Sequence, residues 1–154
     1  MRVIGVDMPS KRDFVLGLGA EHFVDASGKD LGQEVKKITG GMGASAVVVC
    51  AASNESYASA PGMLKRGGTI VCVGMPEGEA EGIKGLGPTQ MVANLLTVTS
   101  TAVGNRRDAV EVLDMAARGL VETKVEVVKM EELENVFKRM EEGKLLGRVV
   151  LDLS

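Results

Sequence analysis

The sequence is poor in the residues that most often bind transition metals. It contains one histidine, His22, and two cysteines, Cys50 and Cys72. A catalytic zinc ion needs three protein ligands from Cys, His, Asp or Glu that converge on one point. Each cysteine lies inside an apolar run of the kind that forms a strand interior. The sequence therefore predicts two buried thiols, no disulfide and no zinc site.

Long apolar runs and strongly basic stretches are also missing. No run approaches the roughly 20 apolar residues that cross a bilayer, and the net charge is −3. The opening residues Met1–Gly5 are too short and too soon polar for a secretory signal. We therefore expect a cytoplasmic protein of one domain's length, with no membrane and no nucleic-acid partner.

Apolar runs alternate with helical patterns along most of the chain. Strands that are apolar at every position, such as Ala46–Ala51, are buried on both faces, as in a parallel sheet covered by helices. The alternation predicts an α/β fold with a doubly wound parallel sheet and helices on both faces. The predicted strands are Val3–Asp7, His22–Asp25, Ala46–Ala51, Thr69–Val73 and Leu95–Val103.

Helices are predicted between these strands. The first begins at Ser10 as N-cap and ends at Gly17, and the others cover 29–39, 54–64, 89–94 and 106–118, the last with Asn105 as N-cap. After Gly119 the rhythm changes to a strand, an amphipathic helix and a closing strand, Gly147–Leu151. We predict one domain over residues 1–119 and a C-terminal tail over 120–154.

Several segments match patterns that carry chemistry. Asp7 ends the first strand, where an acid either binds the ribose of a dinucleotide or simply caps a turn. Gly41–Ala46 has the glycine spacing of a dinucleotide fingerprint but precedes a strand, so we interpret it as a turn. Gly74 follows an apolar strand and either admits a ligand to the sheet edge or serves as a strand-ending turn.

Five segments in register carry a family resemblance. They are Val3–Asp7 (VIGVD), Val73–Pro76 (VGMP), Val103–Arg106 (VGNR), Ala117–Val121 (ARGLV) and Gly143–Val150 (GKLLGRVV). Together they strongly resemble the C-terminal, coenzyme-binding part of zinc-type, medium-chain alcohol dehydrogenases. The likeness is nearest to the tetrameric microbial and fungal branch and covers essentially all 154 residues.

The resemblance implies an incomplete Rossmann-like domain with a set of coenzyme contacts. Asp7 matches the acid that binds the adenosine ribose and selects NAD over NADP, and Lys11 or its neighbour Arg12 matches a basic residue beside that ribose. Val73 and Met75 match residues whose backbone meets the nicotinamide carboxamide. The remaining implied contacts are Ala51 and Ser53 near the adenine, Thr101 and Val103 near the nicotinamide, and Arg148 at the pyrophosphate.

The resemblance also implies what this sequence does not contain. The catalytic zinc half, the first strand and its glycine-rich phosphate turn have no counterpart here. The strands that flank the absent central strand are expected to close up, to accept a strand from another chain, or to leave a gap. Residues 120–154 are a candidate to fill such a gap.

Three functions remain open at this stage. The first is a truncated alcohol dehydrogenase-like domain with weakened NAD binding, no zinc, and no zinc-dependent alcohol oxidation of its own. The second is a non-redox enzyme (a cyclase, isomerase or lyase) that acts on a small hydrophobic molecule, with acid–base candidates Asp7, His22, Asp25 and Tyr57. The third is a structural partner of full-length relatives. Each is compatible with a homodimer through the edge strand Leu95–Val103.

Overall fold

The computed structural model describes residues 1–78 and 81–154, which form two compact units. The first unit is Met1–Val103 and the second is Gly104–Ser154. This division differs from the domain boundary predicted after Gly119, because helix α5 (Arg106–Ala117) groups with the second unit. No helix in the described ranges is long and apolar enough to span a membrane.

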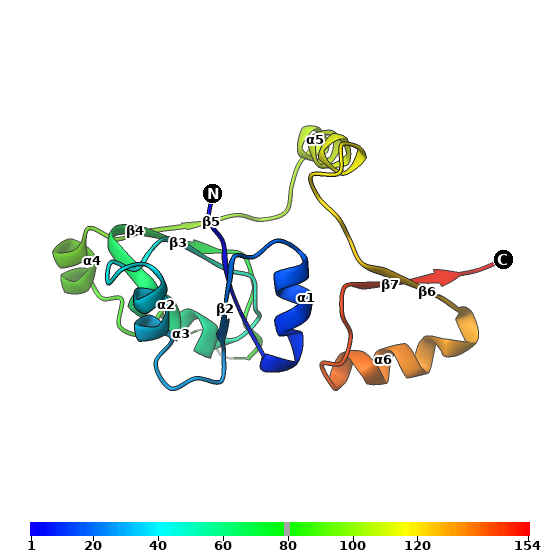
Figure 1. The fold of residues 1–154 in the computed structure, drawn as a ribbon, viewed down its shortest axis with the longest axis horizontal. Coiled ribbons are helices and arrows are strands. Elements are labelled where there is room, and N and C mark those ends of the chain that lie inside the picture. Colours follow the sequence, from blue (N-terminus) through cyan, green and yellow to red (C-terminus); the bar gives the residue numbers. More distant parts are fainter. Residues whose placement is uncertain (79–80) are drawn as a thin grey trace. The chain divides into compact units, whose positions relative to one another are not determined.

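The first unit alternates strands and helices, as the sequence predicts (Figure 1). All its strand pairs are parallel, with β1 beside β2 and β4 between β3 and β5. Its elements are β1 (Ile4–Asp7), η1 (Pro9–Lys11), α1 (Arg12–Gly17), β2 (His22–Asp25), α2 (Leu31–Ile38), β3 (Ala44–Val49), α3 (Asn54–Met63), β4 (Leu64–Cys72), α4 (Pro88–Asn94) and β5 (Thr97–Ser100).

Helices α1 and α2 cover opposite faces of the β1–β2 pair. Phe23 and Val24 are neighbours on β2, so their side chains point to opposite faces of the sheet. The guanidinium of Arg12 on α1 lies 5.5 Å from the Phe23 ring centre, whereas Val24 packs in one cluster with Val35 of α2. The predicted helices on both faces are confirmed.

The core of the first unit lies where α2 and α3 meet the strands. Eight buried residues form one cluster, with Ile70 of β4 and Ala60 of α3 both 0% exposed. Gly32 and Gly62 allow α2 and α3 to approach closely, because a Cβ on Gly32 would lie 2.6 Å from the Gly62 carbonyl oxygen. The remaining members are Val24, Val35, Val49, Tyr57, Met63 and Leu64.

The parallel strands of the first unit form two separate sheets. Within the described residues, β1 is hydrogen-bonded only to β2, and β3 only to β4. Val6 on β1 is 38% exposed and Val48 on β3 is 58% exposed, although both lie in apolar strands. Of the alternatives weighed from the sequence, closing up is not observed within the described residues, because β1 and β3 do not pair.

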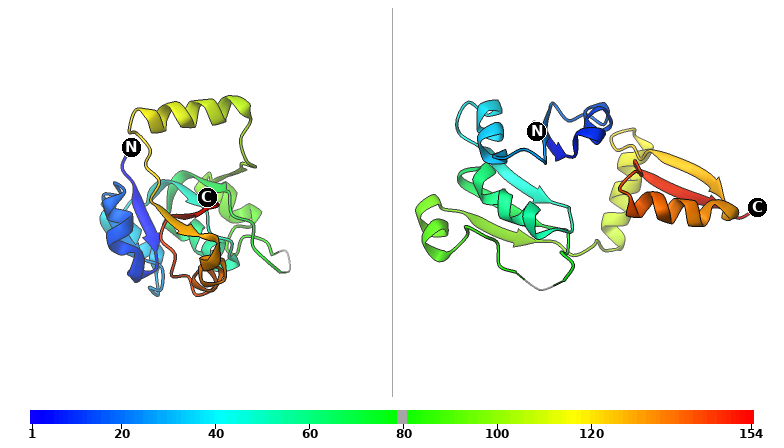
Figure 2. Two further views of the ribbon diagram at one scale, coloured as in Figure 1. Left: turned by 90° about the vertical axis from the view of Figure 1, so that its right-hand side faces the viewer. Right: turned by 90° about the horizontal axis from the view of Figure 1, so that it is seen from below.

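The second unit is a β–α–β arrangement preceded by α5 (Figure 2). Strands β6 (Val125–Lys129) and β7 (Arg148–Asp152) pair in parallel with each other alone, so residues 120–154 add no strand to the other sheets. They are linked by η2 (Met130–Glu132) and α6 (Leu133–Glu141). Arg139 of α6 holds Glu126 of β6 with two hydrogen bonds of 2.9 and 2.6 Å.

Two local predictions were wrong. Ser10 is not an N-cap, because it lies inside the 3-10 turn η1, and α1 begins after Lys11 without a side-chain cap. Strand β3 ends at Val49, so Cys50 lies beyond it and is exposed, while Cys72 is half-buried. The Asn105 cap is confirmed, since its side chain accepts from Arg107 N and Asp108 N.

Candidate functional site

Most of the predicted coenzyme contacts follow strands of the first unit. Because β1 and β2 are parallel to each other, and β3, β4 and β5 likewise, each set of carboxyl ends lies at one edge of its sheet. Open α/β folds bind ligands at this edge. The residues in question are Asp7 at the end of β1, Ala51 and Ser53 after β3, Val73 and Met75 after β4, and Thr101 and Val103 after β5.

Asp7 presents a half-exposed carboxylate at the end of β1. Its Oδ1 accepts a hydrogen bond of 2.7 Å from Met8 N, and Lys11 Nζ lies 3.9 Å from the same oxygen. Oδ2 has no hydrogen-bond partner among the described residues. Arg12 instead stacks on Phe23, so Lys11 is the basic residue beside Asp7. A free carboxylate oxygen next to an ammonium group suits a pair of sugar hydroxyls.

The ends of β3 and β4 are locked together at the same edge. Val49 O accepts hydrogen bonds from Val73 N (3.1 Å) and Gly74 N (2.9 Å). A Cβ on Gly74 would collide with the Ala51 carbonyl and lie 2.8 Å from Cys50 O. This close approach of the protein's own backbone accounts for glycine at position 74. It favours the interpretation of a strand-ending turn over that of access for a ligand. The hydroxyl of Ser53 caps α3 by accepting from Ser56 N at 3.2 Å.

The side chains that follow β4 and β5 are open to solvent. Val73 is 40% exposed, Met75 is 84% exposed, and Val103 is 96% exposed. Thr101 N donates to Cys72 O at 3.1 Å and so extends the β4–β5 ladder. Val103 has φ of 50°, a left-handed conformation that is rare for a β-branched residue. Such strained positions are enriched at functional sites.

Arg148 is the one predicted coenzyme contact that belongs to the second unit. It opens β7, and its N–H donates to Lys124 O at 2.9 Å. Its side chain is exposed. The role implied for it at the pyrophosphate stays a prediction.

The four acid–base candidates do not all come together at one place. His22 opens β2, with its Nε2 3.0 Å from Arg2 Nη2, at the opposite end of that strand from Asp25. Tyr57 is buried in the core at 8% exposure. Asp7 and Asp25 are register partners, but Asp25 Oδ1 accepts from both Ser27 N (2.8 Å) and Ser27 Oγ (2.6 Å).

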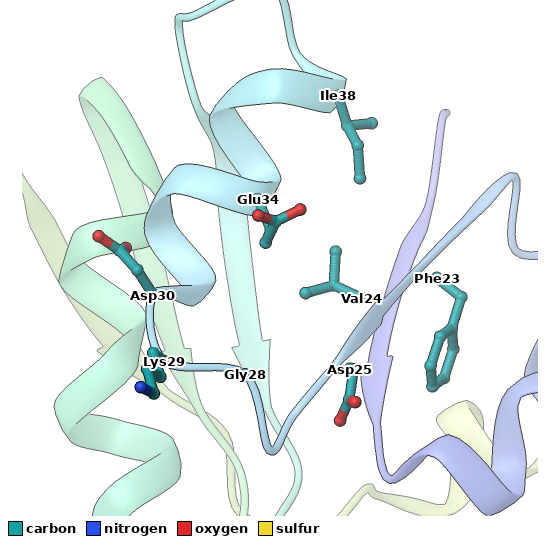
Figure 3. Close-up of a pocket in the computed structure, with 8 residues that line it drawn as sticks. All are labelled: Phe23, Val24, Asp25, Gly28, Lys29, Asp30, Glu34 and Ile38. Atoms are coloured by element: carbon teal, nitrogen blue, oxygen red, sulfur yellow. The ribbon is translucent and has the colours of Figure 1, made fainter.

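A hollow of about 420 Å³ between β2 and α2 contains only one of those candidates, Asp25 (Figure 3). The carboxylates of Asp25, Asp30 and Glu34 point in different directions there, so they form no common acid–base site. A second hollow of about 390 Å³, between α2 and α3, contains none of the four candidates. A non-redox enzyme activity therefore stays a prediction, because neither hollow brings two of the acid–base candidates together. The first hollow is lined by Phe23, Val24, Asp25, Gly28, Lys29, Asp30, Glu34 and Ile38.

The described residues do not fit a zinc ion. No group of three His, Cys, Asp or Glu side chains among them is placed to hold a metal. Cys50 and Cys72 are free thiols at neighbouring strand ends, and His22 opens β2. Metal chemistry is therefore assigned to none of the residues that the structure describes.

Sequence reasoning missed one contact at the candidate site. The Tyr57 hydroxyl donates to Gly74 O at 2.6 Å, across a sequence separation that no local pattern shows. The only available signal was composition, because Tyr57 is the single tyrosine in a chain that is 3% aromatic.

Comparisons with known proteins agree with this fold. The family described as zinc-binding dehydrogenase matches residues 1–118. Alcohol dehydrogenase 2 of Emericella nidulans is 47% identical over 162 aligned residues, covering 100% of this chain and 44% of that protein. Alcohol dehydrogenase 2 of Caenorhabditis elegans is 39% identical over 155 aligned residues, covering 100% of this chain and 43% of that protein.

A solved structure gives the same result in three dimensions. The alcohol dehydrogenase of the archaeon Aeropyrum pernix superposes with a TM-score of 0.87 at 28% identity. The alignment covers 98% of this chain and 42% of that one. This chain therefore spans less than half the length of the relatives it matches. The chain belongs to the zinc-binding dehydrogenase family, and it corresponds to the coenzyme-binding region of an alcohol dehydrogenase.

Proposed function

We propose that the chain supplies the NAD-binding region of an alcohol dehydrogenase and does not by itself carry out zinc-dependent alcohol oxidation. The observation that carries the proposal is the Asp7 carboxylate at the end of β1, with Lys11 3.9 Å away. A carboxylate there accepts hydrogen bonds from ribose hydroxyls and repels a 2′-phosphate, which favours NAD over NADP.

The other contacts divide between the two ends of the coenzyme. Ala51 and Ser53 are proposed to line the adenine side, and Arg148 to meet the pyrophosphate. Val73, Met75, Thr101 and Val103 are proposed to hold the nicotinamide. When bound, the nicotinamide ring accepts or donates a hydride. The residues of this chain orient the ring and exclude water from one side of it.

Affinity for the coenzyme is expected to be low. The glycine spacing of a dinucleotide fingerprint occurs at Gly41–Ala46, which leads into strand β3 rather than from a strand into a helix, so no helix N-terminus follows it to hold a pyrophosphate. We expect a dissociation constant for NADH of roughly millimolar, equivalent to about −4 kcal/mol.

Calorimetric titration with NADH and NADPH tests the proposal. The wild-type chain should prefer NADH by about tenfold, a difference of about 1.4 kcal/mol, and Asp7→Asn should remove the preference. Asp25→Asn is the matched control, because Asp25 is the register partner of Asp7 but its Oδ1 is satisfied by Ser27. Equal binding of both coenzymes by the wild type, or an unchanged ratio in Asp7→Asn, contradicts the proposal.

We also propose that β5 pairs with its copy in a homodimer. All four residues of β5 are exposed, and within the described residues β5 pairs only with β4. An uncharged strand with an open edge is a template for pairing. Sedimentation at micromolar concentration should give a dimer that Val98→Lys converts to monomer, while Val92→Lys on exposed α4 leaves it intact. A wild-type monomer contradicts the proposal.

A cytoplasmic location is part of the same proposal. It rests on the composition of the chain and on the expected absence of disulfides.

A further inference from the structure

Tyr57 connects the buried core of the first unit to the turn that follows β4. The residue lies on α3 with 8% of its surface exposed, and its hydroxyl donates a hydrogen bond of 2.6 Å to Gly74 O. Burial raises the pKa of the Tyr57 phenol, with the neighbouring Cys72 acting in the same direction. The phenol therefore stays protonated at neutral pH and remains a donor.

The same turn is also held from the β3 side. Both Val73 N and Gly74 N donate to Val49 O, and Gly74 Cα packs against the Ala51 carbonyl. The N–H and the C=O of Gly74 are thus both occupied by groups of the protein. What remains open is the flanking residue Met75, which is 84% exposed.

The Gly74–Met75 peptide group transmits the effect of the Tyr57 hydrogen bond. A trans peptide is planar, so its C=O and N–H point in opposite directions. Because the Gly74 carbonyl faces the phenol of α3, the N–H of Met75 must face away from α3. That N–H has no hydrogen-bond partner among the described residues.

We infer that Tyr57 is a positioning residue, which holds the Val73–Met75 turn so that Met75 N–H is presented at the carboxyl edge of the sheet to the carboxamide of a nicotinamide. The inference rests on the proposed function, which places the nicotinamide at this turn. Tyr57 itself contacts no coenzyme atom. Its effect should therefore be confined to the nicotinamide end, leaving the adenosine end at Asp7 unaffected.

The test compares NADH with ADP-ribose, which lacks the nicotinamide. Tyr57→Phe removes only the hydroxyl and keeps the buried ring. It should weaken NADH binding about fivefold to tenfold, the effect of one lost hydrogen bond, and leave ADP-ribose binding unchanged. The control Ser59→Ala removes a hydroxyl on the same helix, which bonds Ser56 O at 2.9 Å, and should change neither affinity.

Equal loss of both ligands in Tyr57→Phe means a general structural role and overturns the inference, as does no loss of either. If the wild type binds neither ligand, the proposed function fails, and amide hydrogen exchange then decides about Tyr57. The inference predicts faster exchange in Tyr57→Phe at the amides of Val73 and Gly74 alone, which are the hydrogen-bonded amides of this turn. Unchanged exchange there, or faster exchange throughout α3 and β4, overturns it.

Discussion

The two units of the chain are stabilised in different ways. Among the described residues, eight of the nine buried hydrophobic side chains belong to the first unit and form one cluster, whereas the second unit contributes Val136 alone. Six of the nine salt bridges between described residues lie in the second unit. Exposed ion pairs contribute little to the free energy of unfolding. With one buried hydrophobic residue, the second unit is packed less tightly than the first. Its strands and helices leave apolar side chains uncovered, such as Val127 at 65% and Phe137 at 54%.

The difference matters because most of the predicted coenzyme contacts lie in the first unit. Asp7, Lys11 and the turns after β3, β4 and β5 all belong to the first unit, and only Arg148 belongs to the second. A buried core holds backbone positions more tightly than a helix and two strands with one buried residue. We therefore expect the first unit to define the site geometry.

The largest expected effect is at the centre of the first core. Ile70→Ala removes a fully buried side chain and should lower the free energy of unfolding of the first unit by about 2–5 kcal/mol. Val127→Ala, at a 65% exposed position in the second unit, should cost about 0.5 kcal/mol or less. Urea unfolding followed by amide exchange measures both. Similar losses in the two variants would remove the proposed contrast.

A glycine substitution tests the second unit next. Gly147 has φ of 80°, and a Cβ there would collide with Lys124 O, which also accepts from Arg148 N. Gly147→Ala should therefore cost about 2 kcal/mol or more, and it should disrupt the start of the β6–β7 pair. Gly119 has φ of 70° but open space around its Cα, so Gly119→Ala should lower the free energy of unfolding by only about 1 kcal/mol. If both variants unfold at the same urea concentration, the close approach to Lys124 is not the cause.

Matched cap removals compare a packed helix with an unpacked one. Asn105 caps α5, which has no buried residue, and Asp30 caps α2, in which Val35 is 2% exposed. Each cap is worth about 1 kcal/mol. Asn105→Ala should fray α5 visibly in NMR chemical shifts, whereas Asp30→Ala should leave α2 helical because the core retains it. Fraying of α2 with an intact α5 would reverse the comparison.

The smallest expected effect is an acid-sensitive contact in the second unit. Hydrogen bonds from Lys129 and Ser154 lower the pKa of Asp152 from 3.8 to about 2. A lowered folded-state pKa means that the contact stabilises the unit above pH 3.8 and is lost as the pH falls toward about 2. Asp152→Asn should flatten the pH dependence of amide hydrogen exchange in β6 and β7 between pH 3.8 and about 2. Asp114→Asn on exposed α5 should not, and an unchanged profile in Asp152→Asn contradicts the assignment.

Strong periodic patterns could be predicted from the sequence. Strand β2 has the predicted bounds His22–Asp25, and α3 and α5 differ from prediction by one residue at their ends. Helix α5 combines an amphipathic pattern with the predicted cap at Asn105, and α3 begins at a side-chain cap, Ser53. Local signals in the sequence are enough to place these segments.

Other features depend on contacts between distant residues. Strand β4 begins at Leu64 because Leu64 pairs with Ala44, which no pattern in Leu64–Gly68 indicates. The Tyr57–Gly74 hydrogen bond and the two separate sheets of the first unit are likewise products of packing. Of the candidate site, the sequence predicted the residues at the strand ends, but only the structure selected Lys11 over Arg12 beside Asp7.

Titration of isotopically labelled protein with NADH, followed residue by residue in amide NMR spectra, tests the central claim most directly. The account predicts concentration-dependent shifts at the amides of Asp7, Ala51, Gly74, Met75 and Thr101, all at the carboxyl ends of strands. Shifts confined to the opposite strand ends around His22 and Ala44, or none up to about 10 mM NADH, would contradict it.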